Sequence, residues 1–529
     1  MIKDQRSENQ PAAESQAPGP KVRRDIATDA AAHALRLLEK VRAATEAQVH
    51  KRAAAKQSEA IAPHAIVIGG GVAGLVAARD LRQTGYRVTV LEAADSFGGC
   101  VRRTEVDGLL LDAGAESFAV RGGSVANYLD ELDLGEAIVQ TSGERAWLIH
   151  AENDKLLANP LPATALLGIP GTVRTDEVRN IIGRAATVRA AADLITPMSR
   201  KWATEKLSLA EVVRSRMGQA VLDELVAPVV NGVYSTDPAQ IDIDAAAPGL
   251  REAMQKTGSL ARAVTALQDS APAGSRVAGL DGGMYTLIEA LTGRLSKAGV
   301  LLVRNSPVTS ITRDKAAAQP FTVHTLGQEL KADRVVIATE AQPALALLNP
   351  LLGEVKQIAA ENQSNAIALA ILVVDKPELD DAPRGSGVLV ARNAPVHAKA
   401  LTHSSAKWPW LGEQSGPGTH VVRLSYGRIG EADELVAGGD DAALIEEAIK
   451  DASKILGVQL QPEDVLGSAV SRFSDMVPLQ GTAAVERRSQ VRAATAEIHG
   501  LDVVGAWLAG TGLARVINHA RGAVAISAS

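Results

Sequence analysis

An α/β fold that contains a parallel β-sheet is predicted by three successive patterns in residues 65–91. Residues 65–68 are apolar (Ala-Ile-Val-Ile), as expected of a buried strand. A cluster of glycines follows and opens an Ala, Leu and Val pattern of helical period that ends at Gly85. Residues 87–91 then alternate as a second strand. Strand, glycine turn, helix and strand make one βαβ unit, whose two strands lie parallel in a sheet.

The remaining sequence alternates between helical and strand-like regions. Strand character is strongest in residues 365–428. Residues 1–60 are polar and highly charged with some helical spacing, so we expect a disordered or helical extension whose partner is unknown. The other expected elements are helical stretches within about 120–270, helices near 284–298, 440–456 and 513–526, and strands near 300–303 and 334–338.

The composition is that of a globular protein with more than one domain. The chain has 529 residues, of which 46% are hydrophobic and 22% are charged. A net charge of −6, from 55 basic and 61 acidic side chains, makes nucleic acid an unexpected partner. The single cysteine, Cys100, can form no disulfide within the chain and no thiolate zinc site, so we expect a cytoplasmic location and no metal. No apolar stretch reaches the roughly 20 residues that span a bilayer, so no transmembrane segment is predicted.

The glycine turn has the spacing of a dinucleotide-binding site. Its glycines allow a tight turn, close approach of a pyrophosphate and close helix packing, and the helix N-terminus offers N–H donors to phosphate. Glu92 lies about 20 residues further on, at the end of the second strand, where a carboxylate binds ribose hydroxyls. The predicted binding residues are Gly69, Gly70, Gly71, Val72, Ala73, Gly74, Glu92 and Ala93.

A second glycine pair favours FAD over NAD as the dinucleotide. Gly98 and Gly99 come shortly after Glu92, and a third glycine corner follows at Gly114, which brings more backbone close to an elongated cofactor. Near the C-terminus a glycine turn again precedes a helix, and its N–H groups would stabilise negative charge on a reduced flavin. The residues of that turn are Gly510, Thr511, Gly512 and Leu513.

The sequence resembles the flavin amine oxidase superfamily and, within it, the soluble porphyrinogen oxidases of bacterial haem synthesis. The resemblance covers residues 65–529, and its more specific stretches are 112–118, 228–238, 385–390, 404–409 and 505–512. It implies a Rossmann-like FAD-binding domain that is discontinuous, an inserted α+β substrate-binding domain and a helical subdomain. The implied boundaries are 61–135, 275–345 and 480–529 for the FAD-binding domain, 136–274 for the helical and substrate-binding region, and 346–479 for the substrate-binding sheet.

The resemblance also implies roles for individual residues. Arg145 would pair with a propionate of the substrate, Arg121 would be a second anion anchor, and Gly232 and Leu389 would flank the macrocycle. A surface arginine, a turn glycine and a core leucine are the alternatives for these positions. Cys100 would lie beside the cofactor as a small buried side chain. The other implied cofactor contacts are Gly114, Ala115, Glu116 and Ser117 near the flavin and the backbone of Val308 at the adenine.

The activity implied is the flavin-dependent oxidation of a porphyrinogen to a porphyrin, with O2 as acceptor and hydrogen peroxide as product. The flavin carries the redox chemistry, so no catalytic acid or base is assigned to the protein. Coproporphyrinogen III is the favoured substrate and protoporphyrinogen IX the alternative. Two departures from the family pattern, at His519-Ala520 and in residues 479–482, fall near the expected flavin ring. An amine oxidase, a carotenoid-type desaturase and a non-catalytic flavin scaffold are further alternatives.

Overall fold

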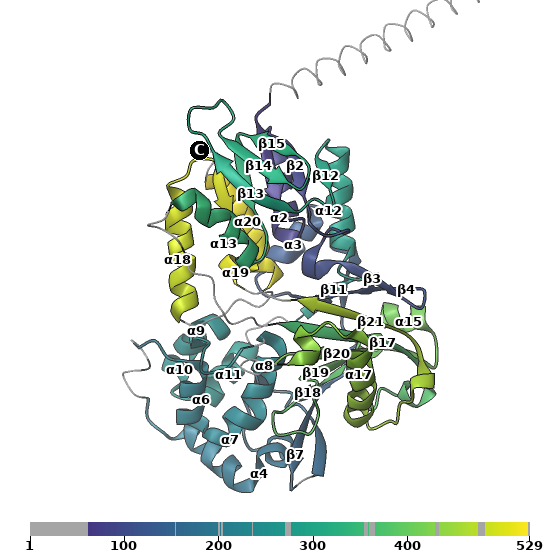
Figure 1. Cartoon of the computed structure of the whole chain (residues 1–529). Helices are drawn as coiled ribbons and strands as arrows, with labels where there is room; N and C mark the ends of the chain where they lie inside the picture. Colours follow the sequence, from purple (N-terminus) through teal and green to yellow (C-terminus); the bar gives the residue numbers. More distant parts are fainter. Residues whose placement is uncertain are drawn as a thin grey trace, which may run out of the picture. The chain divides into compact units, whose positions relative to one another are not determined.

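The computed structural model describes residues 62–153, 155–198, 202, 205–234, 236–269, 277–353, 358, 366–428, 433–473, 482–510 and 512–526 (Figure 1). Residues Pro63–Ser529 form one compact unit. The extension predicted over residues 1–60 lies outside the described residues. Within the described ranges, no helix is both long enough and apolar enough to cross a bilayer.

A five-stranded parallel sheet contains the predicted βαβ unit. Its strand order is β12 (Leu301–Val303), β2 (Arg87–Leu91), β1 (His64–Ile68), β16 (Arg334–Ile337) and β22 (Leu501–Val503), and every neighbouring pair is parallel. All five residues of β1 are buried, because a parallel sheet is covered on both faces. The prediction of an α/β fold with a parallel sheet is confirmed.

Helices cover one face of this sheet (Figure 1). The helix α2 (Val72–Gln83) packs beside α20 (Leu513–Ile526) and α12 (Thr286–Lys297). Leu75, Leu81 and Leu291 of α2 and α12 are 0% exposed, and burying each leucine contributes roughly 1.5–3 kcal/mol. The other face is covered by α13 (Ala341–Leu352), α18 (Thr482–Ala496) and an antiparallel sheet of β13 (Val308–Arg313), β14 (Phe321–Thr325) and β15 (Glu329–Ala332).

A second, seven-stranded sheet lies later in the chain. Its strand order is β21 (Val465–Phe473), β17 (Ile367–Asp375), β20 (Thr419–Tyr426), β19 (Ala400–His403), β18 (Gly387–Val390), β7 (Ala146–Glu152) and β8 (Lys155–Pro160). Only β18 and β7 pair in parallel. The helix α17 (Asp441–Leu456) covers one face with Leu444, Ala448 and Ile455. The strand-rich region predicted at 365–428 and the helix predicted at 440–456 are confirmed.

A helical region separates β8 from the later strands. Its helices are α4 (Asp176–Ala191), α6 (Leu209–Met217), α7 (Gln219–Val221), α8 (Ala227–Tyr234), α9 (Ile243–Ala246), α10 (Leu250–Thr257) and α11 (Leu260–Asp269). The buried carboxylate of Asp193 accepts from Arg216 Nε at 2.5 Å and from Ser259 Oγ at 2.6 Å. It also accepts from the backbone of Leu260 and Ala261, so it caps the start of α11.

The prediction of helices through about 120–270 is wrong for residues 138–170. This stretch contains β7, β8, β6 (Ile138–Gln140), β9 (Ala165–Leu166) and β10 (Ile169–Pro170). The strand β7 aligns Leu148 with Leu389 of β18, a partner far away in the sequence. Local periodicity does not encode such long-range pairing, which overrides an Ala- and Leu-rich helical pattern.

The remaining elements are shorter. They are β3 (Arg103–Val106), β4 (Leu109–Asp112), β5 (Phe118–Ala119), β11 (Val277–Leu280), α3 (Ser124–Asp130), α14 (Ser404–Lys407), α15 (Pro409–Ser415), α16 (Glu434–Ala437), α19 (Ala506–Ala509), and the short turns η1 (Gly99–Val101), η2 (Gly135–Ala137), η3 (Ala192–Leu194), η4 (Leu222–Val226), η6 (Pro377–Leu379) and η7 (Pro462–Asp464).

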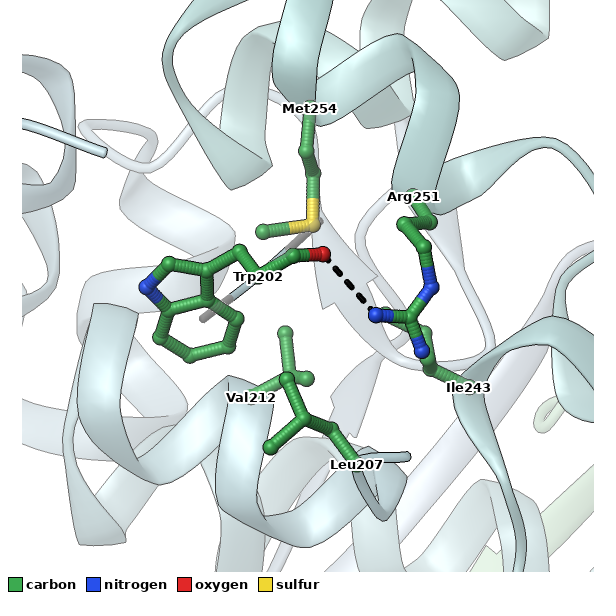
Figure 2. Close-up of a pocket in the computed structure, with 6 residues that line it drawn as sticks. All are labelled: Trp202, Leu207, Val212, Ile243, Arg251 and Met254. Carbon is green, nitrogen blue, oxygen red and sulfur yellow. Dashed lines mark hydrogen bonds between the residues drawn. The ribbon is translucent and has the colours of Figure 1, made fainter. Parts of the chain in front are cut away.

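A small gap in the helical region is a feature of packing. Figure 2 shows Trp202, Leu207, Val212, Ile243 and Met254 around it, with Arg251 at its edge. The guanidinium of Arg251 donates to the Trp202 carbonyl at 2.8 Å and pairs with Asp244. The gap leaves no room for the centre of a water molecule.

Candidate functional site

The glycine turn between β1 and α2 is closed by backbone on one side and open on the other. A Cβ on Gly69 (φ +106°) would lie 2.7 Å from the Ala338 carbonyl oxygen, and one on Gly74 would lie 1.9 Å from the Gly69 oxygen. A Cβ on Gly71 would meet no protein atom within 4 Å. Val72 and Ala73, the first residues of the 12-residue helix α2, are buried. Because Gly71 caps this helix and has open space beside it, the N-terminus of α2 faces that space. That geometry fits a bound pyrophosphate.

Glu92 is held against the turn. Its Oε2 accepts from the Gly70 N–H at 2.7 Å, and its Oε1 accepts from the Ala94 N–H at 2.8 Å. The Glu92 carbonyl accepts from Ser306 N–H at 2.8 Å, which brings the start of β13, at Val308, beside Glu92 and the exposed Ala93. The structure thus gathers the residues predicted to bind adenosine near the carboxyl end of β2 in the parallel sheet.

The second glycine pair continues the same surface. Gly98 N–H donates to the Gly70 carbonyl at 2.8 Å, and Ala115 N–H donates to the Cys100 carbonyl at 2.7 Å. A Cβ on Gly114 would lie 2.2 Å from that Cys100 oxygen, so only glycine fits there. Gly99 is exposed. Turn, glycine pair and Gly114 loop therefore form one hydrogen-bonded series of backbone segments.

Cys100 has the environment of an unreactive thiol. Burial raises its pKa to about 11, which keeps the sulfur protonated at neutral pH. The Cys100 side chain is half-buried, and its place beside the cofactor stays a prediction.

The C-terminal turn lies against the same strand end as the glycine turn. Trp507 Nε1 donates to the Thr339 carbonyl at 3.2 Å, directly after the Ala338 that contacts Gly69. Gly510 (φ +93°) and Gly512 (φ +102°) both adopt the left-handed region that favours glycine, and Leu513 then begins α20. Thr511 lies outside the described residues. The segments predicted to contact the pyrophosphate and the flavin thus share one support.

The loop that follows Gly114 joins the seven-stranded sheet through Glu116. Its carboxylate accepts from Lys407 Nζ at 2.5 Å, from Arg423 Nη1 at 3.0 Å and from Ser404 Oγ at 3.2 Å. Burial alone would raise the pKa of Glu116, but Lys407 and Arg423 lower it to about 2, so the group stays ionised. Ser117, the next residue, is half-buried.

Sequence reasoning missed the partners of Glu116. Residues 404–409 carried the family resemblance, but nothing local indicated that Ser404 and Lys407 reach a carboxylate so far back in the chain. Arg423 was not singled out at all. The only signal in the sequence was the presence of a cation in each of two elements, Lys407 in α14 and Arg423 in β20.

Asp112 lies just before the loop of residues 114–117 and supports its N-terminal end. Its two oxygens accept from the backbone N–H groups of Met284 and Tyr285, both at 2.9 Å. Burial raises the pKa of Asp112 to about 6 despite these bonds. The carboxylate therefore connects the end of β4 to the start of α12.

One face of the seven-stranded sheet remains partly open. A row across it, read from the strand register, contains Leu148, Leu389, Ala400, Ser425 and Leu369. All of these except Leu148 are half-buried, whereas residues on the opposite face, such as those of the α17 core, are fully buried. Solvent therefore reaches part of this face, which we call the open sheet face.

Two of the predicted substrate residues meet there. A Cβ on Gly232 of α8 would lie 2.5 Å from Leu389 Cδ2, so α8 crosses the open sheet face in contact with β18. A larger side chain at this crossing would have to move the end of the Leu389 side chain.

The two predicted anion anchors already have protein partners. Arg145 precedes β7 and donates from Nη2 to Glu177 Oε1 at 2.8 Å and to the Leu161 carbonyl at 2.7 Å. Arg121 lies between β5 and α3, where it donates to the Pro248 carbonyl at 3.2 Å. Arg145 is close to the β18 strand that carries Leu389, whereas Arg121 is on a separate loop.

The departures near the C-terminus have structural surroundings of their own. His519 is half-buried in α20, and burial and the nearby Arg492 lower its pKa. Arg521 pairs with Glu131 at 2.8 Å and with Asp80 at 3.4 Å, which ties α20 to α3 and α2. Residues 479–481 lie outside the described residues.

Comparisons with known proteins identify the family. Residues 72–525 match the family model of flavin containing amine oxidoreductases. Coproporphyrinogen III oxidase of Mycobacterium leprae is 30% identical over 87% of this chain and 96% of that protein. The Bacillus subtilis protein of the same name is 24% identical over 87% of this chain and 97% of that protein.

A solved structure matches over a similar extent. It is the crystal structure of an Exiguobacterium sp. 255-15 protein provisionally named a protoporphyrinogen oxidase, with a TM-score of 0.74 and 25% identity, and it covers 88% of this chain and 98% of that one. The glycine turn, the acidic residue after β2 and the family match together make FAD the cofactor and the chain an oxidoreductase. The chain belongs to the flavin containing amine oxidoreductases.

Proposed function

We propose that this chain oxidises coproporphyrinogen III to coproporphyrin III, with FAD as cofactor and O2 as electron acceptor. The observation that carries the proposal is the alignment with a coproporphyrinogen III oxidase over 96% of that relative's length. A match of this extent includes both the cofactor half and the sheet that would receive the substrate. Protoporphyrinogen IX is the second candidate, because the matching solved structure is named for that activity.

The cofactor would lie along the series of backbone segments described above. The pyrophosphate would approach Gly71 at the N-terminus of α2, and Glu92 would accept hydrogen bonds from the ribose hydroxyls. The flavin end would lie between the Gly114 loop and the turn before α20. FAD, when bound, supplies the acceptor for two electrons and a proton as hydride.

The open sheet face would receive the macrocycle. A flat apolar ring needs a floor of small and apolar side chains, and Ala400 and Leu369 would provide one. Gly232 and Leu389 would flank the ring. Arg145 would bind a propionate, for which it would have to exchange its present partner Glu177.

The stoichiometry of the reaction sets the demand on the site. Conversion of a porphyrinogen to a porphyrin removes six electrons and six protons, so three two-electron rounds are needed, each reducing one O2 to one hydrogen peroxide. The protein's task is to hold the ring at the cofactor and exclude competing reactions. We assign no acid or base to it. The domain boundaries and a cytoplasmic location belong to this proposal as well.

The test is oxidation of each porphyrinogen by the purified holoenzyme in air. Porphyrin fluorescence and hydrogen peroxide are followed together, with heat-denatured protein as the control for spontaneous oxidation. We expect coproporphyrin to form faster than the control, with three peroxide molecules per porphyrin. Porphyrin formation at the control rate with both substrates would refute the proposal, and preference for protoporphyrinogen IX would replace the substrate assignment.

A further inference from the structure

We propose that Arg423 is a positioning residue that fixes the loop of residues 114–117 to the open sheet face, and so sets the spacing between cofactor and substrate. The inference rests on the proposed function for the identity of the two ligands. Its structural basis is the contact between the loop of residues 114–117, which the proposal places beside FAD, and the open sheet face, which the proposal assigns to the porphyrinogen.

Arg423 makes two contacts with the loop from one planar group. Nη1 donates to Glu116 Oε2 at 3.0 Å, and Nη2 donates to the Gly114 carbonyl at 2.5 Å. The Arg423 side chain is only 10% exposed and the Glu116 side chain 13%. The fork of a guanidinium can reach a carboxylate and a carbonyl together, whereas the single ammonium of a lysine cannot do so with this geometry.

Lys407 donates to the other oxygen of Glu116, Oε1, and Ser404 shares Oε2 with Arg423. Lys407 and Ser404 both come from α14, and the backbone of that helix is itself fixed, since the Lys407 carbonyl accepts from Ser142 N–H at 2.9 Å. The Lys407 ammonium also lies 5.0 Å from the centre of the Trp408 ring. The loop is thus held by two separate elements, the strand β20 and the helix α14, so it has little freedom to shift sideways.

The other end of the loop leads to the cofactor turn. Ala115 N–H donates to the Cys100 carbonyl, and Gly98 N–H donates to the Gly70 carbonyl. Backbone hydrogen bonds therefore run from the turn at α2 to the loop that Arg423 holds.

Arg423 also belongs to the open sheet face. The register places it in one row with Thr402 and Gly387, next to the row that contains Ala400 and Leu389. The same side chain thus touches the cofactor loop from the floor of the substrate site. A displacement of about 1 Å between reacting groups can reduce a rate by on the order of 100-fold, so this junction should control turnover more than substrate affinity.

The test compares Arg423→Lys with Arg472→Lys in the holoenzyme. Arg472 is the matched control, because it donates to the Leu435 and Val436 carbonyls and pairs with Asp441, but on the opposite, α17-covered side of the same sheet. For Arg423→Lys we expect kcat for coproporphyrinogen III to fall roughly 10- to 100-fold with KM changed less than about threefold, and the visible band of bound flavin to shift. For Arg472→Lys we expect lower thermal stability with kcat, KM and spectrum unchanged.

Unchanged kcat and flavin spectrum in Arg423→Lys, or equal effects of the two variants, would overturn the proposal. If Arg423→Lys does not fold, Glu116→Gln takes its place, with the same expected split between kcat and KM. If the wild-type protein oxidises neither porphyrinogen, the proposed function fails by itself. The flavin spectrum and the FAD dissociation constant of the two arginine variants then decide the positioning role: a change confined to Arg423→Lys supports it, and no change overturns it.

Discussion

Alanine substitutions at Gly71 and Gly74 should separate cofactor binding from folding. Gly71 has extended backbone (φ −73°, ψ 179°) and open space beside it, so Gly71→Ala should cost less than about 1 kcal/mol of apoprotein stability. Gly74 has no such space, because its Cβ would lie 1.9 Å from a backbone oxygen. We expect Gly74→Ala to cost about 2–3 kcal/mol, since the helix cannot move away from the turn without losing packing.

The order of the two variants in FAD affinity should be the reverse of their order in stability. Gly71→Ala, the more stable variant, should bind FAD more weakly than Gly74→Ala does. The Gly71→Ala methyl would occupy the space assigned to the pyrophosphate, so the dissociation constant should rise on the order of 100-fold, equivalent to about 3 kcal/mol. Titration of the apoprotein with FAD, followed by quenching of flavin fluorescence, measures this value, and chemical denaturation of the apoprotein measures stability. Wild-type FAD affinity in Gly71→Ala would refute the cofactor placement. Wild-type stability in Gly74→Ala would refute the packing argument.

Three further predictions concern single side chains. Asp193→Asn should lower the free energy of unfolding by about 3–5 kcal/mol in chemical denaturation, because it leaves Arg216 as an uncompensated buried charge; a loss below 1 kcal/mol would contradict this. Arg145→Ala should raise KM for coproporphyrinogen III without changing FAD content, whereas Glu177→Gln should lower KM by freeing the arginine; an unchanged KM in both would exclude the anchoring role. The lowered pKa of Glu116 contributes stability that is present above its ordinary pKa of 4.5 and is lost as the pH falls towards about 2. The free energy of unfolding should therefore fall less steeply with falling pH in Glu116→Gln than in the wild type over that range. Parallel curves for the two proteins would count against the ion cluster.

The cofactor turn could be predicted from the sequence because its signals are local. The strand before Gly69, the glycines and Glu92 all lie within about one βαβ unit, where each step follows from short-range sterics and hydrogen bonds. Structure added the physical reason for each glycine: Gly69 and Gly74 are needed for close packing, whereas Gly71 faces open space.

The junction of cofactor loop and substrate sheet could not be predicted in this way. Glu116 is separated from Lys407 by 291 positions and from Arg423 by 307, and no local pattern specifies such pairs. The same limit explains the strand β7, whose partner strand β18 is also far away in the sequence. Helical periodicity did not predict the structure of residues 138–170. Pairing with other strands of the sheet, and not the local propensity, decides the conformation there.

Anaerobic mixing of the purified holoenzyme with coproporphyrinogen III tests the central claim most directly. We expect the visible absorption of the bound flavin to bleach under anaerobic conditions. When air is admitted, the flavin colour should return and coproporphyrin fluorescence should appear as the three rounds of oxidation are completed. Flavin absorption that persists after coproporphyrinogen III is added, in a protein that dithionite does bleach, would contradict the claim that this chain passes electrons from a porphyrinogen to FAD.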